Sequence, residues 1–223
     1  MQSWMVCAFS SHLQTFIDLP TDGAGQYDLR ALERHFMRGG QIRKASLLAL
    51  IGAVTELLRR EPNVITVDDN CLIFGDYHGQ YFDFIGQQGD AEWKRTDHVT
   101  VFLGDYVDRG EMGVELLVTL LCMKLNAPTR VVMLRGNHEC KALTAAFGFR
   151  TECLWKCGLD VYDAFCTLFL ALPLAVHLKR DLGSFLLCHG GISPELKTLE
   201  DIQRLNRFCD PPKAGLFCDL LWA

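Results

Sequence analysis

Short runs of β-branched and aromatic residues, several of which end at a glycine, alternate with stretches of helical periodicity along this 223-residue chain. The expected strands cover residues 63–67, 71–74, 98–103, 130–134, 174–178 and 184–188, and the expected helical regions cover residues 27–60, 113–125 and 140–172. Strands that alternate with helices are typical of domains in which helices cover a largely buried sheet. The pattern predicts an α/β architecture, and the length suits one domain with a sizeable core.

Polar residues of the kinds that carry chemistry are concentrated directly after four of these expected strands. The four segments are residues 75–79 (GDYHG), 104–110 (GDYVDRG), 135–139 (RGNHE) and 189–191 (HGG). In α/β folds, ligands bind outside the carboxyl ends of the strands. We therefore expect the four segments to converge on one site, with glycines that allow tight turns and close backbone approach.

Five side chains in these segments offer carboxylate, imidazole or amide donors and no thiolate: Asp76, His78, Asp105, Asn137 and His189. This mixture suits Fe, Mn or Zn in a site open to water, and it does not suit a closed structural zinc site. Because five ligands exceed the need of one catalytic metal, we expect two ions with Asp105 as a bridge. Two metals activate a shared water and hold both the attacking and the departing oxygen of a phosphoryl transfer.

Each of these residues also has a simpler interpretation when it is taken alone. An aspartate or histidine after a strand often serves a turn or a helix cap, and Asp108 with Arg109 alone indicates a surface ion pair. Glu139 either orients its neighbours or caps the following helix. The occurrence of four clusters together favours a site, and the role of Glu139 stays open between these two interpretations.

Further segments accompany the clusters in a recognisable order: residues 31–39 (ALERHFMRG), 135–143 (RGNHECKAL), 161–164 (VYDA) and 198–212 (TLEDIQRLNRFCDPP). With these motifs the chain resembles the phosphoprotein phosphatase (PPP) family of metal-dependent serine/threonine phosphatases, and within it the calcineurin catalytic subunits. The resemblance runs from about residue 27 to the last residue. It implies a metallophosphoesterase-like β-sandwich flanked by helices and incomplete at the C-terminus, with an N-terminal segment at residues 1–25 and a partial catalytic domain at residues 26–223.

The resemblance also implies a role for each candidate residue in the hydrolysis of phosphoserine and phosphothreonine esters by direct attack of a metal-bridging water. Asp76 and His78 would hold the first metal, Asp105 would bridge, and Asn137 and His189 would hold the second. His138 would be the general acid, oriented by Asp108. Arg109 would bind the phosphate, together with Asn137 and His138. The implied ions are Fe with Zn, or Mn.

Some parts of the family pattern have no counterpart in this chain. A further metal-binding histidine, a second phosphate-binding arginine, and the segments that bind a calcium-binding regulatory subunit and calmodulin would all follow residue 223. The resemblance therefore predicts that the chain is truncated and, alone, only weakly active. Two alternatives remain: an inactive phosphatase-like binding module, and a dinuclear hydrolase of another phosphoester. The calcineurin-like segments outside the site argue against the second alternative.

Composition limits the partners and the compartment. The formal net charge is −5 and the pI is about 5.8, so the chain lacks the basic surface expected of a nucleic-acid binder. The longest apolar stretch, residues 164–176, is too short to span a membrane, and the N-terminus does not resemble a secretory signal. The ten cysteines are scattered, mostly in apolar runs, which favours reduced thiols. We expect a cytoplasmic protein, and the resemblance implies phosphoprotein substrates.

Overall fold

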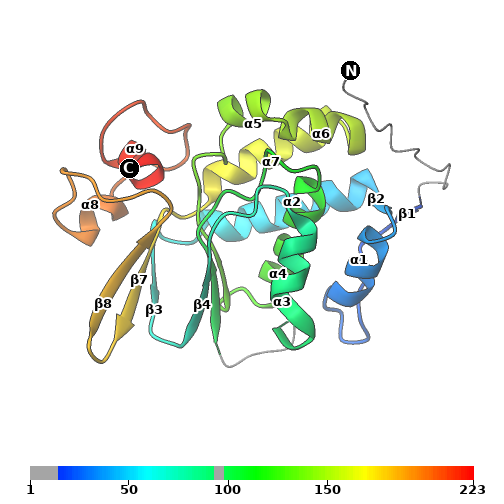
Figure 1. Ribbon diagram of the computed structural model, residues 1–223, viewed down its shortest axis with the longest axis horizontal. Helices are drawn as coiled ribbons and strands as arrows, with labels where there is room; N and C mark the ends of the chain where they lie inside the picture. The colour runs from blue at the N-terminus through cyan, green and yellow to red at the C-terminus, as the bar shows by residue number, and fades with distance from the viewer. Residues whose placement is uncertain (1–14, 93–97) are drawn as a thin grey trace, which may run out of the picture.

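The computed structural model describes residues 15–92 and 98–223 (Figure 1). Its strands are β1 (Phe16–Ile17), β2 (Gln41–Ile42), β3 (Val64–Val67), β4 (Cys71–Phe74), β5 (Val99–Phe102), β6 (Val131–Met133), β7 (Ala175–Arg180) and β8 (Gly183–Cys188). Its helices are α1 (Leu29–Phe36), α2 (Lys44–Arg59), α3 (Tyr81–Glu92), α4 (Gly113–Asn126), α5 (Lys141–Phe147), α6 (Phe149–Lys156), α7 (Leu159–Ala171), α8 (Leu199–Gln203) and α9 (Leu216–Trp222).

Two three-stranded sheets form the centre of the fold, in the orders β4-β5-β6 and β3-β7-β8. The first sheet is all parallel, whereas in the second β3 and β7 are parallel and β8 returns antiparallel to β7. Alternate residues of the strands meet between the sheets, where Val101 and Val132 share a buried apolar cluster with Val67 and Val176. Two sheets that enclose a common apolar layer form a β-sandwich.

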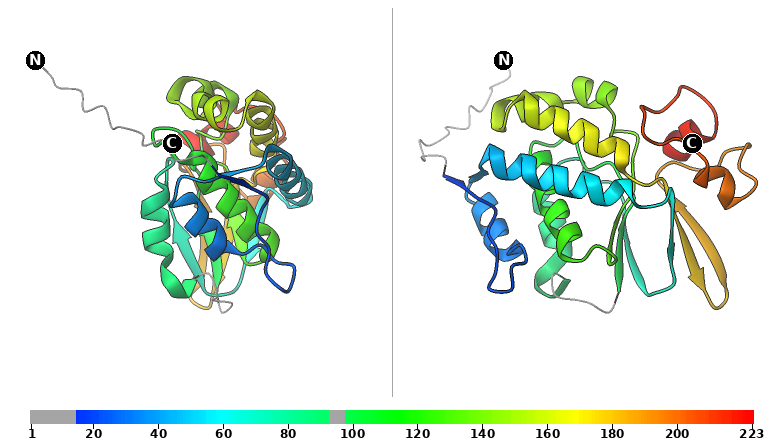
Figure 2. Two further views of the ribbon diagram at one scale, coloured as in Figure 1. Left: turned by 90° about the vertical axis from the view of Figure 1, so that its right-hand side faces the viewer. Right: turned by 180° about the vertical axis from the view of Figure 1, so that it is seen from behind.

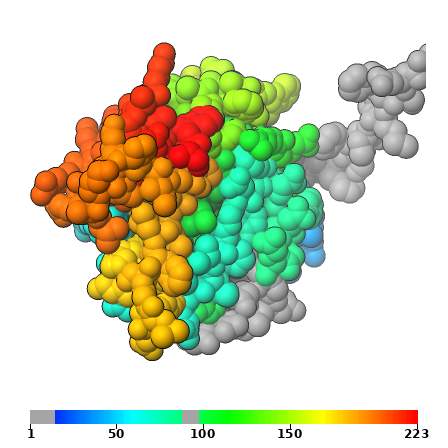
Figure 3. Space-filling view, turned by 60° about the vertical axis from the view of Figure 1, so that its left-hand side comes forward, coloured from blue at the N-terminus to red at the C-terminus, as the bar shows by residue number. Residues whose placement is uncertain are grey.

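Helices cover the other face of the β4-β5-β6 sheet (Figures 1 and 2). Phe102 of β5 and Met133 of β6 belong to the large buried cluster formed with α1, α2, α4 and α7. A smaller cluster packs α8 and α9 against β3, β7 and β8 through residues such as Ile202 and Leu220. In the space-filling view the orange and red C-terminal segment lies over one end of the yellow β8 hairpin (Figure 3). The predicted helix-flanked β-sandwich is thereby confirmed.

The helical regions expected from periodicity are interrupted more often than the pattern indicated. Residues 27–60 form α1 and α2 with β2 between them, and β2 pairs in parallel with β1. Residues 140–172 form three helices, because Gly148 and Gly158 adopt φ angles of 126° and 99° at the breaks. Such angles lie outside the right-handed helical region, so a helix cannot continue through either glycine.

Within the described residues, none of the helices combines the length and the apolarity that a membrane crossing requires.

Candidate metal centre

The four polar segments meet at one edge of the sandwich, as their position after strands predicted. β4, β5 and β6 are parallel and end at this edge, and the hairpin returns β8 to the same edge (Figure 1). Backbone bonds join the segments: the N–H groups of Tyr77 and His78 donate to the Asp105 carbonyl, and that of Gly110 donates to the His78 carbonyl. His189 reaches the β5 end through a 3.1 Å contact from Nδ1 to the Leu103 carbonyl.

The backbone of the site is strained at four candidate residues. Among the described residues other than glycine, those with positive φ are His78 (44°), Asp105 (55°), Asp108 (69°) and Arg109 (65°). A side chain in this region costs free energy, and such residues persist where the surrounding structure holds them for function. The positive φ angles direct these side chains to positions that an extended or helical backbone would not give them.

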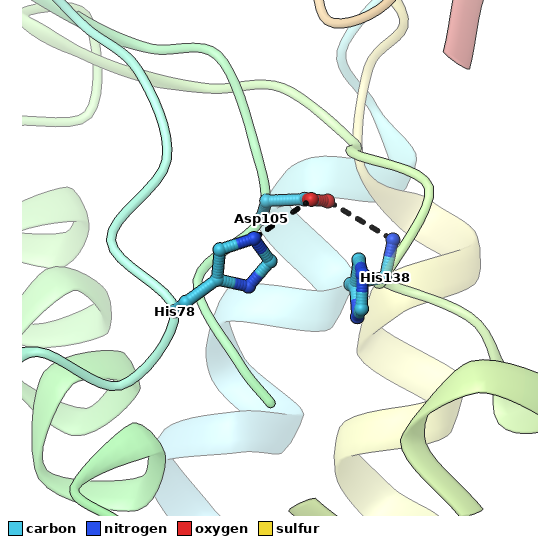
Figure 4. A group of neighbouring side chains, drawn as sticks. All are labelled: His78, Asp105 and His138. Atoms are coloured by element: carbon cyan, nitrogen blue, oxygen red, sulfur yellow. Dashed lines mark hydrogen bonds and ion pairs between the residues drawn. The ribbon is translucent and has the colours of Figure 1, made fainter. Parts of the chain in front are cut away.

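Asp105 lies at the centre of the candidate ligands and faces two histidines (Figure 4 shows His78). Its Oδ2 is 3.3 Å from His78 Nε2, and its Oδ1 is 3.3 Å from His189 Nε2. Asp76 is near both histidines, with Oδ2 at 3.6 Å from His78 Nε2 and Oδ1 at 4.0 Å from His189 Nδ1. Asn137 Oδ1 is 3.1 Å from His189 Nε2. All five predicted metal ligands therefore lie together.

The hydrogen bonds of the two histidines leave both Nε2 atoms ready to coordinate a metal. His78 Nδ1 is 2.8 Å from the Val107 carbonyl, and His189 Nδ1 faces the Leu103 carbonyl. Because a carbonyl only accepts, each Nδ1 carries the hydrogen and each Nε2 presents a lone pair. The His78 Nε2 atom is buried without a hydrogen-bond partner among the described residues. At His189 the Nε2 lone pair faces the Asn137 and Asp105 oxygens. Lone pairs and oxygen atoms that face one another in this way are suited to bind cations between them.

His138 and Asp108 form the buried pair that the sequence predicted. Nδ1 of His138 is 2.7 Å from Asp108 Oδ2, and the other Asp108 oxygen accepts the backbone N–H of Phe149 at 2.9 Å. Nε2 of His138 is 3.4 Å from an Arg109 guanidinium nitrogen, and the Phe147 ring packs edge-on against the imidazole. The backbone N–H of His138 donates to Asp105 Oδ1 at 3.0 Å (Figure 4). The imidazole is thus held beside the ligand cluster with Nε2 directed at Arg109.

Glu139 connects the β5 and β6 segments, which settles its role in favour of orienting its neighbours. The fully buried carboxylate accepts backbone N–H groups of Asp105 at 2.7 Å, Tyr106 at 2.9 Å and Gly136 at 2.9 Å. Burial and the nearby Asp105 charge raise the pKa of Glu139 above its ordinary value, and the three backbone donors oppose this rise. The only sequence signal for this role is that the glutamate ends the polar segment 135–139, directly before an expected helix.

Arg135 fixes the same loop from its other side. Its side chain is fully buried, and its guanidinium donates to the carbonyls of Glu139 at 3.0 Å, Arg207 at 3.0 Å and Cys209 at 2.9 Å. The segment at 207–209 is thereby attached to the loop that carries Asn137 and His138. The sequence does not indicate this role for Arg135, because the neighbouring residues do not distinguish a buried arginine from an exposed one.

Gly136 and Gly104 allow the β5 and β6 ends to approach closely. A Cβ atom on Gly136 would overlap the Asp105 carboxylate and backbone nitrogen, and one on Gly104 would overlap the Gly136 backbone. A side chain at either position would push Asp105 away from its partners. These glycines are therefore part of the geometry of the site.

Comparison with known proteins agrees with the motifs. The chain is 43% identical over 220 residues to the serine/threonine-protein phosphatase 2B catalytic subunit A2 of Saccharomyces cerevisiae, covering 98% of this chain and 35% of that protein. It is also 43% identical over 198 residues to catalytic subunit A1 of the same yeast, covering 86% of this chain and 34% of that protein. The chain thus spans about a third of the length of these curated relatives.

The solved structures and the family models agree on the fold. A protein serine/threonine phosphatase from Saccharomyces cerevisiae superposes with a TM-score of 0.80 at 31% identity, covering 86% of this chain and 62% of that chain. Residues 70–223 match the family model described as calcineurin-like phosphoesterase. This span contains all the candidate ligands and the Asp108–His138 pair. The predicted metallophosphoesterase-like fold is confirmed, and the chain belongs to the calcineurin-like phosphoesterase family.

Proposed function

We propose that the chain carries the active site of a metal-dependent protein serine/threonine phosphatase. The observation that carries this proposal is the position of Asp105, whose two carboxylate oxygens lie 3.3 Å from His78 Nε2 and 3.3 Å from His189 Nε2. A carboxylate between two groups of ligands suits a bridge between two ions. The His138 imidazole beside it suits proton transfer to a departing oxygen.

The donors divide into two sets around Asp105. We assign Asp76 and His78 to one ion and Asn137 and His189 to the other, with Asp105 shared. Nitrogen and oxygen donors without sulfur suit Fe with Zn, or Mn. Metal ions bound there would lower the pKa of a shared water and offset the negative charge of a phosphoryl group.

The side chains next to these ligands supply phosphate binding. The Arg109 guanidinium lies 3.4 Å from His138 Nε2 and offers paired N–H donors to phosphate oxygens. The Asn137 amide nitrogen and the His138 imidazole complete the phosphate-binding set. Because the chain as a whole has a net charge of −5, the attraction of a phosphoester must arise locally at this site.

His138 is suited to act as the general acid. Asp108 accepts from Nδ1 at 2.7 Å and holds the imidazole in one orientation, so that Nε2 is the ring nitrogen from which a proton would pass to the serine or threonine oxygen as the ester bond breaks. The Phe149 N–H bond to Asp108 holds the carboxylate in place. Asp108 therefore acts through His138 as its positioning residue.

Protein serine and threonine phosphoesters are the best-supported substrates. The two yeast relatives at 43% identity are both named serine/threonine-protein phosphatase catalytic subunits. The two alternatives from the sequence, an inactive binding module and a hydrolase of another phosphoester, have no comparable support. We also propose a calcium-binding regulatory subunit and calmodulin as partners.

The proposal is tested by assaying the purified chain with added Mn²⁺ on p-nitrophenyl phosphate and on a phosphoserine peptide. We expect hydrolysis that requires Mn²⁺ and that the substitution His138→Asn lowers sharply on the peptide. Asp160→Asn is a matched control, because Asp160 is half exposed and pairs with Lys44 at 2.8 Å. Hydrolysis without metal, or equal rates for the parent and His138→Asn, would contradict the proposal.

We also propose a cytoplasmic location and a division into an N-terminal segment at 1–25 and a catalytic domain at 26–223. The nine described cysteines are free thiols, which agrees with a reducing compartment. Cys122, Cys140 and Cys153 are buried, and Cys209 is exposed. The family match from residue 70 onward lies within the proposed domain.

A further inference from the structure

The turn between α5 and α6 contacts the residues that we assign to proton transfer and phosphate binding. The backbone N–H of Phe149 donates to Asp108 Oδ1 at 2.9 Å, and the backbone N–H of Arg109 donates to the Phe147 carbonyl at 3.3 Å. The Phe147 ring packs edge-on against the His138 imidazole, with 5.3 Å between the ring centroids. One short turn therefore holds the proposed general acid, its carboxylate partner and the phosphate-binding arginine.

The two phenylalanines of this turn have different surroundings. Phe149 is fully buried and packs against Phe165 and Phe169 of α7, with centroid distances of 5.5 Å and 6.0 Å. Gly148 adopts a φ of 126°, which residues with a side chain rarely adopt, and the chain turns at this point. Phe147 is 53% exposed. Because Phe149 anchors the turn to the core, the Phe147 ring is available for a contact outside the core.

The His138 imidazole is held by groups from separate parts of the chain. Asp108 accepts from Nδ1 at 2.7 Å, and an Arg109 nitrogen lies 3.4 Å from Nε2. The His78 ring packs edge-on against the imidazole at 4.7 Å between centroids. A hydrogen bond at one nitrogen lets the ring tilt about that bond, whereas neighbouring rings restrict this motion. Phe147 supplies such a ring from α5, so its loss leaves the imidazole less restrained although Asp108 stays in place.

We propose that Phe147 is a positioning residue for His138, the proposed general acid. The inference rests on the proposed phosphatase function and adds to it a side chain from outside the four polar segments that follow the strands. A general acid must lie within hydrogen-bond reach of the departing oxygen, so an imidazole that tilts away transfers its proton less often. Phe147 thereby affects the chemical step and leaves metal binding and substrate binding unchanged.

The test compares Phe147→Ala with Phe147→Tyr, which keeps an aromatic ring, and with Phe16→Ala, which removes a ring of similar exposure (47%) from β1. For a phosphoserine peptide, we expect Phe147→Ala to lower kcat about three- to tenfold at an unchanged KM, in line with the contribution of an aromatic pair. Phe147→Tyr and Phe16→Ala should keep the parent kcat. Phe147→Ala should hydrolyse p-nitrophenyl phosphate at the parent rate, because this weakly basic leaving group needs little protonation.

A double substitution asks whether Phe147 acts through His138. In a His138→Asn protein, Phe147→Ala should cause no further fall in kcat, because the residue that it positions is absent. An unchanged kcat for Phe147→Ala alone overturns the inference while the phosphatase function stands. A further fall in the His138→Asn protein, or equal losses for the peptide and p-nitrophenyl phosphate, also overturns it, because the effect would then not depend on proton transfer.

If the purified chain hydrolyses no substrate, the proposed function fails, and nuclear magnetic resonance tests the position of the imidazole separately. The Nδ1 hydrogen of His138, which is bonded to Asp108 at 2.7 Å, should exchange slowly with water in the parent and in Phe16→Ala. We expect its resonance to broaden or disappear in Phe147→Ala, because a loosened imidazole exposes this hydrogen to water. Equal exchange rates in the parent and Phe147→Ala overturn the inference.

Discussion

Oδ2 of Asp108 lies 2.7 Å from Nδ1 of His138, inside a pair whose side chains are 0% and 3% exposed. The buried carboxylate holds the imidazole in one orientation and places Nε2 on the side of Arg109. This relationship connects the strained turn after β5 to the chemistry that we assign to His138.

Asp108→Asn removes this charge while the side chain keeps its size. We expect kcat for a phosphoserine peptide to fall about 10²- to 10³-fold, the usual contribution of an oriented general acid. Mn²⁺ stoichiometry should not change, because Asp108 is not a candidate ligand. Steady-state kinetics together with a metal count check both statements. An unchanged kcat would remove His138 from its proposed role.

Glu139→Gln replaces a carboxylate that accepts three backbone N–H groups. An amide nitrogen in place of one oxygen leaves at least one of these buried donors without an acceptor, so we expect the free energy of unfolding to fall by about 1–3 kcal/mol. Because Asp105 loses its backbone anchor, Mn²⁺ should also bind more weakly. Glu56→Gln, at an exposed partner of Arg59, is the control for stability. If calorimetric titration gives equal Mn²⁺ affinities for the parent and Glu139→Gln, Glu139 does not hold Asp105 in its metal-binding position.

Gly136→Ala tests the close approach of the β5 and β6 ends. Its methyl group would overlap the Asp105 carboxylate, so we expect reduced Mn²⁺ affinity and a lower melting temperature. Gly52→Ala is the matched control, because Gly52 lies exposed in α2 with nothing within 4 Å of an added Cβ. That change should stabilise the protein by about 0.5–1 kcal/mol. Identical effects of the two substitutions would show that crowding at Gly136 is unimportant.

Glu152 should make the stability of the protein depend on pH. Burial raises its pKa from 4.5 to about 7, although Lys156 and the Val114 N–H oppose this. The folded state then holds the proton more tightly than the unfolded state, so stability falls as pH rises from about 4.5 to about 7. The loss is at most about 3 kcal/mol. The free energy of unfolding, measured with denaturant, should fall more steeply with pH over this range for the parent than for Glu152→Gln. Parallel curves of unfolding free energy against pH would contradict the raised pKa of Glu152.

The strands were predictable from the sequence because their signals are local. Residues 71–74 form β4 at the predicted positions, and the strands expected at 98–103 and 130–134 form β5 and β6 within one residue at each end. Helix breaks were not predictable from periodicity, because the apolar pattern continues through Gly148 and Gly158. Only their backbone angles reveal the breaks.

The candidate ligands were also predictable, because each follows a strand and is a residue type that binds metals. Their mutual contacts depend on how β8 returns antiparallel to β7, which brings His189 at its end to Asp105. The clamp of Glu139 and the anchor of Arg135 were not predictable, since both roles depend on burial and on backbone partners far away in the chain. The roles of the individual site residues stay predictions until the substitutions are made.

The most direct test of the two-ion site is anomalous scattering from crystals of this protein grown with MnCl₂. We predict two manganese peaks that share the Asp105 carboxylate, one next to His78 and Asp76 and the other next to His189 and Asn137. A single peak held by only one of the two histidines, or no peak next to Asp105, would contradict the account.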